Sequence, residues 1–177
     1  MNNTFINQYL ESAKSEFRRY KSLGQSSINL LSENELNENT NDANSIAIIV
    51  KHLYGNMRSR WTNIFTEDGE KSDRNRDEEF SDKFMSKDMI LTTYASAWTY
   101  LEDTLNSLTN DDFDKPVKIR NESLTLIQAI NRQISHYAYH IGQIVIMSKQ
   151  FKGENWISLS IPKGKSLDFK NGNYTKQ

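Results

Sequence analysis

Cysteine is absent from the 177-residue sequence, so the chain can form no disulfide, offer no thiolate metal ligand and supply no cysteine nucleophile. Proline and glycine are scarce, with 2 and 7 residues, and this scarcity favours long helices over a turn-rich β-sandwich. An excess of one charge is also missing, because 22 basic and 23 acidic residues leave a net charge of -1. We therefore expect neither a nucleic acid nor a membrane surface as a partner.

Long hydrophobic runs are missing as well. The longest purely apolar run, residues 46–50, is far shorter than the roughly 20 residues of a membrane helix. No basic segment and no signal-length apolar stretch stands at the start, so the sequence predicts a cytoplasmic protein. The sequence contains 36% hydrophobic and 11% aromatic residues, which is enough for one sizeable core. We therefore expect a single domain over residues 1–177.

Four segments carry apolar residues at steps of three and four, which is the spacing of one face of an amphipathic helix. Gly153 follows the last of these segments and is expected to end its helix. Four helices of similar length predict an all-α fold, a four-helix bundle. The predicted helices cover about residues 3–31, 44–65, 80 or 86 to 108, and 125–151.

The connectors between these helices are polar and longer than those of a minimal bundle, so the pattern leaves the helix order open. Residues 32–44 have the composition of a turn, and the charge-alternating residues 66–79 predict a solvated loop. Residues 117–124 predict a small hairpin that turns at Asn121. The tail, residues 156–177, is expected to lie as a loop or short helix against the bundle.

The sequence contains three histidines, and all of them fall on predicted helices. His136 and His140 are four residues apart, which places both imidazoles on one face of the fourth helix. His52 lies on the second helix beside its apolar stripe. Ligands that converge from two helices are a common way to build a metal site in a bundle, and three imidazoles suit Zn²⁺ or Ni²⁺ with a position left open. The alternative is that each is an ordinary core or surface histidine.

Polar residues near these histidines are candidates for orienting an imidazole or binding a substrate. Asn56, Arg132 and Gln143 each lie about one helical turn from a histidine, although a plain polar residue at the helix rim is an equal alternative. Arg74 and Arg76, in the charged loop, are candidates for holding an anionic group of a substrate at the pocket rim. For the loop as a whole, a solvated surface is the alternative.

His52, together with the motif that joins His136 and His140 to Gly142 and Gln143, resembles the DinB-like superfamily, which includes the YfiT-like thiol transferases. Further stretches are similar to one branch of it that is known only as a domain of unknown function. The resemblance covers nearly the whole chain and implies a four-helix bundle, often a homodimer, whose three histidines hold a divalent metal. These further stretches are residues 52–61, 68–71, 74–77, 129–133 and 160–166.

Characterised members of the superfamily include transferases that use bacillithiol, mycothiol or glutathione. The resemblance implies a metal-dependent transferase that adds a low-molecular-weight thiol to a small electrophilic substrate. Because the chain has no cysteine, that thiol would have to arrive as a cofactor. Two alternatives stay open: a non-catalytic metal- or small-ligand-binding stress protein, and a metal-dependent hydrolase whose base comes from a residue such as Glu102 or Asp103.

Overall fold

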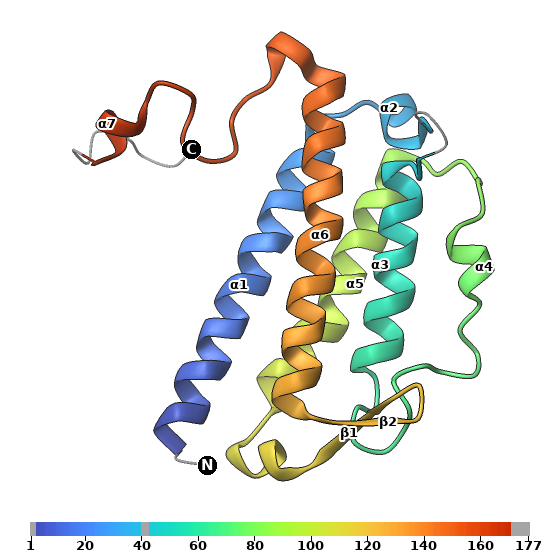
Figure 1. Ribbon diagram of the computed structural model, residues 1–177. Helices are drawn as coiled ribbons and strands as arrows, with labels where there is room; N and C mark the ends of the chain where they lie inside the picture. Colours follow the sequence, from blue (N-terminus) through green and yellow to red (C-terminus); the bar gives the residue numbers. More distant parts are fainter. Residues whose placement is uncertain (1–2, 40–42, 171–177) are drawn as a thin grey trace.

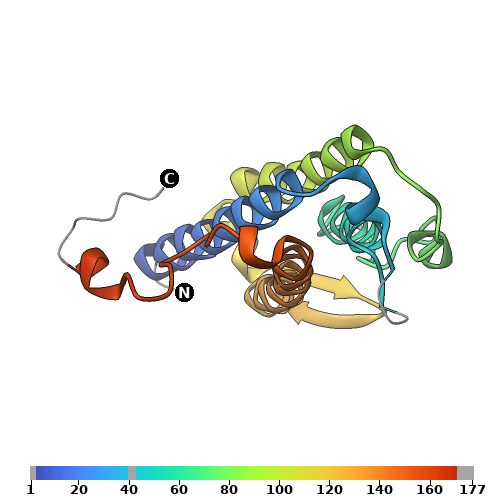
Figure 2. The ribbon, with the colours of Figure 1, turned by 90° about the horizontal axis from the view of Figure 1, so that it is seen from above.

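The computed structural model describes residues 3–39 and 43–170, and in it four long helices lie side by side (Figures 1 and 2). The fold is mostly helical, as predicted, and the predicted helices differ from the observed ones by a few residues at their ends. The four long helices are α1 (Asn3–Asn29), α3 (Ile46–Trp61), α5 (Lys87–Ser107) and α6 (Leu126–Lys152).

The order of the bundle follows from the directions of its helices. In Figure 1, α1 and α6 run one way and α3 and α5 run the other. Because α3 and α5 are parallel, the chain must return along the outside of α3 between them, and this return carries the short helix α4 (Arg76–Glu79). The prediction of a solvated loop over residues 66–79 is therefore wrong in part, since Glu79 at its end is buried.

The small elements cap the two ends of the bundle. Near one end, α2 (Glu33–Asn37) begins at Ser32, whose side chain and that of Glu35 form a reciprocal capping box. Near the other, β1 (Pro116–Ile119) and β2 (Glu122–Thr125) form the predicted hairpin.

The hairpin turn is made by Arg120 and Asn121, which have φ angles of 56° and 62°. Two consecutive left-handed residues are typical of the tight hairpin turn whose twist matches that of the strands. The predicted turn at Asn121 is therefore confirmed. A 3₁₀ turn, η1 (Asn110–Asp114), leads from α5 into this hairpin.

The tail departs from its prediction. Helix α6 ends at Gly153, where φ is 51°, as expected, and the 3₁₀ turn η2 (Gly153–Asn155) follows. Beyond it, the chain and the short helix α7 (Ser166–Lys170) extend away from the bundle in both views instead of lying against it (Figures 1 and 2). At the C-terminal end of α6, Lys152 forms an ion pair with Glu35 of α2 at 3.0 Å. This end of the bundle is therefore joined to α2 and not to the tail. The last part of the predicted tail, residues 171–177, lies outside the described residues.

The core fixes how α6 is rotated. Tyr137 is fully buried, and the rings of Phe17 and Trp98 each lie 5.9 Å from its own ring. Trp61 Nε1 donates a hydrogen bond to the Tyr137 hydroxyl at 2.9 Å, which in turn donates to Asn56 at 3.1 Å. Burying one such ring contributes about 1.5–3 kcal/mol, so this face of α6 is held inward.

None of the described helices is both long and apolar enough to cross a membrane.

Candidate metal centre

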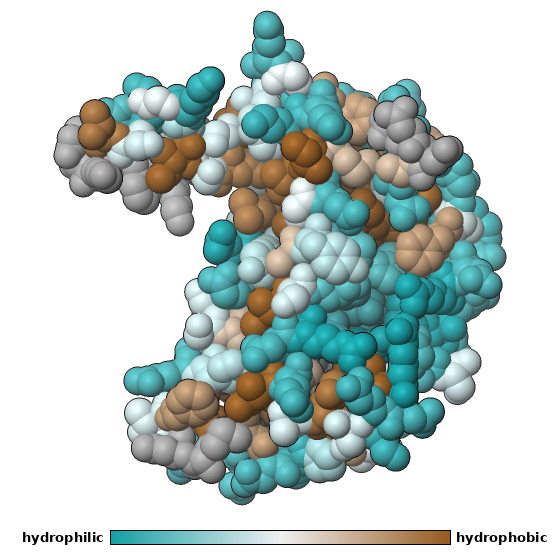
Figure 3. All heavy atoms as spheres, in the orientation of Figure 1, coloured by the Kyte–Doolittle hydropathy of each residue, from teal (hydrophilic) through white to brown (hydrophobic). Residues whose placement is uncertain are grey.

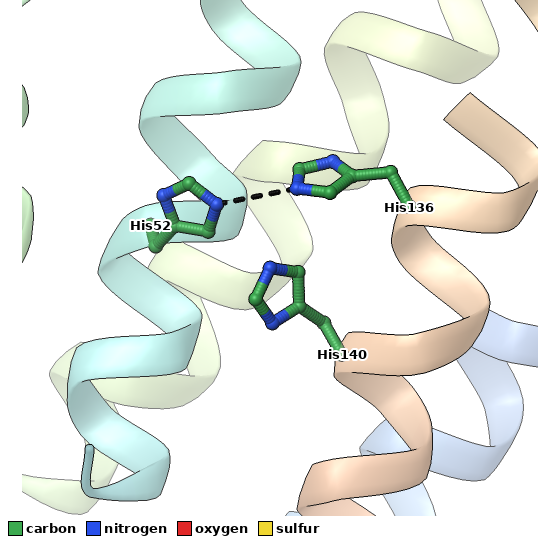
Figure 4. Close-up of side chains that lie close together, drawn as sticks. All are labelled: His52, His136 and His140. Carbon is green, nitrogen blue, oxygen red and sulfur yellow. Dashed lines mark hydrogen bonds between the residues drawn. The ribbon is translucent and has the colours of Figure 1, made fainter. Parts of the chain in front are cut away.

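Three histidines converge between α3 and α6 (Figure 4). His52 projects from α3, while His136 and His140 project from successive turns of α6. One ring nitrogen from each lies within 4.8 Å of the others, and Nε2 of His52 is 3.3 Å from Nε2 of His136. His52 and His140 are buried and His136 is half-buried. The arrangement that the helical spacing predicts is thus present, and such a cluster could hold a metal ion.

His52 is oriented by a carboxylate that the sequence analysis missed. Its Nδ1 lies 2.9 Å from Oε2 of Glu79. Because an ionised carboxylate only accepts hydrogen bonds, Nδ1 carries the proton, and in the neutral ring, the form that binds a metal, Nε2 keeps its lone pair. A carboxylate behind a ligating histidine fixes the ring and raises the basicity of the ligand nitrogen.

Glu79 is held in turn by Arg74. The guanidinium donates from Nε to Oε1 at 2.7 Å and from Nη2 to Oε2 at 2.8 Å, and the two side chains are only 3% and 8% exposed. Burial alone would raise the pKa of the Glu79 carboxyl, but the hydrogen bonds from Arg74 and His52 outweigh it and keep that pKa below its usual value. Glu79 is therefore ionised at neutral pH.

Gly55 makes room for this carboxylate on α3. A Cβ atom at position 55 would lie 2.0 Å from Oε1 of Glu79, which is far inside van der Waals contact. Gly55 is three residues after His52, so it lies on the same face one turn along the helix. The glycine thus allows the Glu79 carboxylate to approach the helix closely enough to reach the imidazole.

The network continues from Arg74 to the hairpin. Arg74 Nη1 donates to Glu70 at 3.2 Å, and Glu70 also accepts from Arg60 at 3.1 Å and from Arg120 of the hairpin turn at 2.8 Å. Burial opposes ionisation of Glu70, but these arginines lower its pKa to about 2. Asp68 accepts hydrogen bonds from the backbone N–H groups of Arg120 and Asn121, at 2.8 and 2.7 Å. The connection that carries Glu79 is thereby anchored at its start.

His140 has a simpler neighbour. Its Nδ1 lies 2.8 Å from Oε1 of Gln143, an exposed residue one turn further along α6. With the Nδ1 proton donated to the amide oxygen, Nε2 keeps its lone pair. That Nε2 atom is buried and has no hydrogen-bond partner among the described residues. A buried polar atom without a partner costs free energy and calls for an explanation.

The imidazoles of α6 resist protonation. Burial, together with the neighbouring imidazoles His140 and His52, lowers the pKa of His136 to about 3. Burial and the neighbouring His52 lower the pKa of His140 to about 4, against the hydrogen bond that it donates to Gln143, which raises the pKa. Both rings are therefore neutral at pH 7, which is the form that binds a metal.

The other predicted site residues lie in different places. Asn56 is buried, but its side-chain oxygen accepts from Tyr137 in the core. Arg132 is at the surface, where it pairs with Glu122 at 3.1 Å. For Arg74, the expected role in holding a substrate anion at the rim is wrong, because its side chain is only 3% exposed and its guanidinium is occupied by the protein's own carboxylates. Arg74 supports His52 through Glu79 instead.

Arg76 lies at the surface beside Phe80, and its role in binding a substrate anion stays a prediction. It is exposed and its guanidinium carbon lies 5.9 Å from the centre of the Phe80 ring. Phe80 itself packs at 5.0 Å against the ring of His52. On the other side, Tyr139 lies 4.2 Å from His140 and 5.2 Å from His136 between ring centres.

The chain belongs to the DUF1572 family, a family described as proteins of unknown function, whose match covers residues 4–165. That range includes all three histidines, Glu79 and the first part of the tail. No curated protein and no solved structure matches the chain. What the site does must therefore be argued from its own geometry.

Proposed function

We propose that this protein is a metal-dependent enzyme of the DinB-like superfamily, in which His52, His136 and His140 hold a divalent ion such as Zn²⁺ or Ni²⁺. The observation that carries the proposal is Nε2 of His140, which is buried and lacks a partner within the described chain, on a ring that offers a nitrogen within 4.8 Å of ligand atoms on the other two histidines. A bound ion would satisfy this atom.

One pair of donor nitrogens already has the separation that such an ion requires. Two nitrogens that bind a tetrahedral zinc at about 2.0–2.1 Å lie about 3.3–3.4 Å apart, which is the separation of the Nε2 atoms of His52 and His136, 3.3 Å. Glu79 and Gln143 hold the Nδ1 atoms of His52 and His140, so both rings present Nε2. Three protein ligands leave a position for a substrate or cofactor, as catalytic sites require.

When bound, a divalent ion with an open position would lower the pKa of a thiol or polarise an oxygen. Following the resemblance to the thiol transferases, we propose that a low-molecular-weight thiol of the bacillithiol or glutathione type is the nucleophile, and because the chain has no cysteine this thiol must come from solution. Its sulfur would form a bond to an electrophilic carbon, the leaving group would depart with the electron pair of the bond that breaks, and the thiol proton would pass to solvent. The histidines act as ligands and Glu79 as a positioning residue.

Hydrolysis is less well supported, because it needs a carboxylate free to take a proton from water. Both oxygens of Glu79 are held by Arg74 and His52. Of the bases considered from the sequence, Glu102 pairs with Lys21 at 2.8 Å.

Three further expectations stay predictions: the cytoplasmic location, the single domain and the homodimer implied by the resemblance. Light scattering of the purified protein tests the last of them.

The experiment compares wild-type protein with His136→Ala after loading with Zn²⁺ or Ni²⁺. Wild type should hold one equivalent of metal by elemental analysis and consume glutathione or bacillithiol with a chromogenic electrophile, and the variant should do neither. Ser135→Ala, an exposed neighbour on the same helix, should behave as wild type. Failure to take up metal would overturn the proposal, whereas metal uptake without turnover would favour the non-catalytic stress protein.

A further inference from the structure

The mouth of the histidine cluster is lined by exposed side chains that the proposed ligand set does not use. Phe80, at the C-terminal end of α4, packs on His52, and Tyr139 of α6 packs on His140 and His136. Both rings are solvent-accessible, with 36% and 54% of their surface exposed, although the imidazoles beneath are largely buried. Flat apolar surface is therefore available at two sides of the site.

A positive charge stands next to this aromatic surface. Arg76 lies over the Phe80 ring at 5.9 Å. Arg76 is the first residue of α4, so this charge lies on the Phe80 side of the histidine cluster. Figure 3 shows the face over α6 and α4 as a mixture of apolar and strongly hydrophilic atoms.

Arg76 differs from the other cations of its segment in having no ion-pair partner within the described ranges. Its neighbours are all paired: Arg74 with Glu79 and Glu70, Lys71 with Glu67, and Lys83 with Glu78. A guanidinium presents a planar fork of donors that matches a carboxylate, and for Arg76 no such carboxylate stands among the residues that the structure describes. This is the cation that a ligand could use.

We propose that this rim selects a substrate with a flat apolar group and a carboxylate, the flat group resting on Phe80 and Tyr139 and the carboxylate paired with Arg76. The inference rests on the proposed function, since it names the substrate class of the same site. It also assigns different roles to Arg74 and Arg76, for which the sequence predicts the same role. Arg74 neutralises a carboxylate of the protein, and Arg76 is left to neutralise one that arrives from solution.

The test uses cinnamate, a flat aromatic carboxylate, and its neutral amide cinnamamide, with acetate as an anion that lacks the ring. Dissociation constants are measured by calorimetry on wild-type protein, first without metal and then loaded with Zn²⁺. Cinnamate should bind more tightly than the other two probes in both states. Arg76→Gln should weaken cinnamate binding about three- to fivefold, as expected for a partly exposed charge pair, and leave cinnamamide unchanged.

Two further variants make the test specific. Lys83→Gln removes a cation from the same segment, one that already has a partner, and should leave cinnamate binding unchanged. Tyr139→Ala should weaken cinnamate and cinnamamide equally. Equal effects of Arg76→Gln and Lys83→Gln, or cinnamate binding that appears only with Zn²⁺ and ignores Arg76, would overturn the inference.

Zinc uptake separates this inference from the proposed function. Arg76→Gln should bind Zn²⁺ as tightly as wild type, because Arg76 touches none of the three histidines in the described structure. If zinc binds and the preference for cinnamate is absent, the rim inference alone fails. If zinc does not bind and the Arg76-dependent preference for cinnamate persists, the proposed metal function fails and the rim inference stands.

Discussion

The two walls of the candidate site are supported in different ways. On the α3 wall, His52 is backed by a buried, charged relay in which Glu79 is held by Arg74. On the α6 wall, His140 is backed by the neutral, exposed Gln143, and no hydrogen bond to Nδ1 of His136 is found in the described structure. On α6 the helical repeat alone places His136 and His140 on one face. On α3, a separate segment must fold back before Glu79 can orient His52.

This difference indicates which wall of the site contributes more to the stability of the protein. A buried carboxylate and guanidinium are costly to remove from water and are retained only while both partners are present. The α3 wall should therefore be sensitive to single substitutions, and the α6 wall tolerant of them. Four predictions test this contrast, in order of decreasing effect.

The largest effect is expected for Glu79→Ala. It leaves Arg74 buried with only Glu70 as a partner and His52 without its acceptor, so it should lower the free energy of unfolding by about 3 kcal/mol. Glu79→Gln retains an acceptor for His52 but should still weaken zinc binding by about 10- to 100-fold. Urea denaturation and a competitive zinc titration measure the two quantities.

Glu78→Gln is the matched control, because Glu78 is the adjacent residue and pairs with Lys83 at the surface. It should change neither the denaturation midpoint nor the zinc affinity. If the two glutamates gave the same result, the charged relay would have no special role and the contrast between the walls would be lost.

The second prediction concerns acid and belongs to the α6 wall. His136 and His140 have folded pKa values of about 3 and about 4, mainly because they are buried, against about 6.5 in an unfolded chain. Between these values the unfolded state binds more protons than the folded state. The stability that the metal-free protein gains from keeping these two imidazoles neutral should therefore be fully present above pH 6.5. This contribution should be lost as the pH falls toward 4.

At pH 5 the loss should be up to about 1 kcal/mol for each imidazole, after allowance for solvent screening. Urea denaturation of the metal-free protein at pH 7 and pH 5 measures it, with His136→Asn as the comparison. The variant should lose less stability over this interval. Glu70, with a pKa of about 2, titrates below the interval, so an unchanged slope in the variant would contradict the assignment.

The third prediction compares the two glycines that follow the histidines. Gly55→Ala brings a Cβ into contact with Glu79 and should destabilise the protein by about 1–2 kcal/mol while weakening zinc binding. Gly142→Ala on α6 meets no atom within 4 Å, so it should stabilise the helix by about 0.5–1 kcal/mol and leave zinc binding unchanged. Thermal denaturation and zinc titration of both variants decide the matter, and a stabilised Gly55→Ala protein would show that the close approach of Glu79 is dispensable.

The sequence allowed prediction of the parts that depend on local spacing. The helices, the hairpin turn and the pairing of His136 with His140 follow from periods of a few residues. His52 could be added because it lies on an apolar helix and the chain has only three histidines.

The carboxylate behind His52 could not be predicted in this way. Asp77, Glu78 and Glu79 are three consecutive acids in a run of alternating charge, and nothing local distinguishes the one that becomes buried. The choice depends on how the chain returns along α3, which is a matter of tertiary structure. The one sequence signal was Gly55, a glycine inside a helix one turn from His52, since such glycines often mark a close approach.

The smallest effect is expected for Gln143→Ala. Gln143 is exposed, so water can replace its amide oxygen as the acceptor for Nδ1 of His140, and the free energy of unfolding should change by less than about 0.5 kcal/mol. Zinc affinity should fall by less than about tenfold, below the loss expected for Glu79→Gln, because a neutral amide polarises the ring less than a carboxylate does. Gln150→Ala, exposed on the same helix and remote from the histidines in sequence, is the control. If Gln143→Ala weakened zinc binding as much as Glu79→Gln does, the ligand nitrogens would depend equally on both walls, and helical spacing alone would not suffice to place His140.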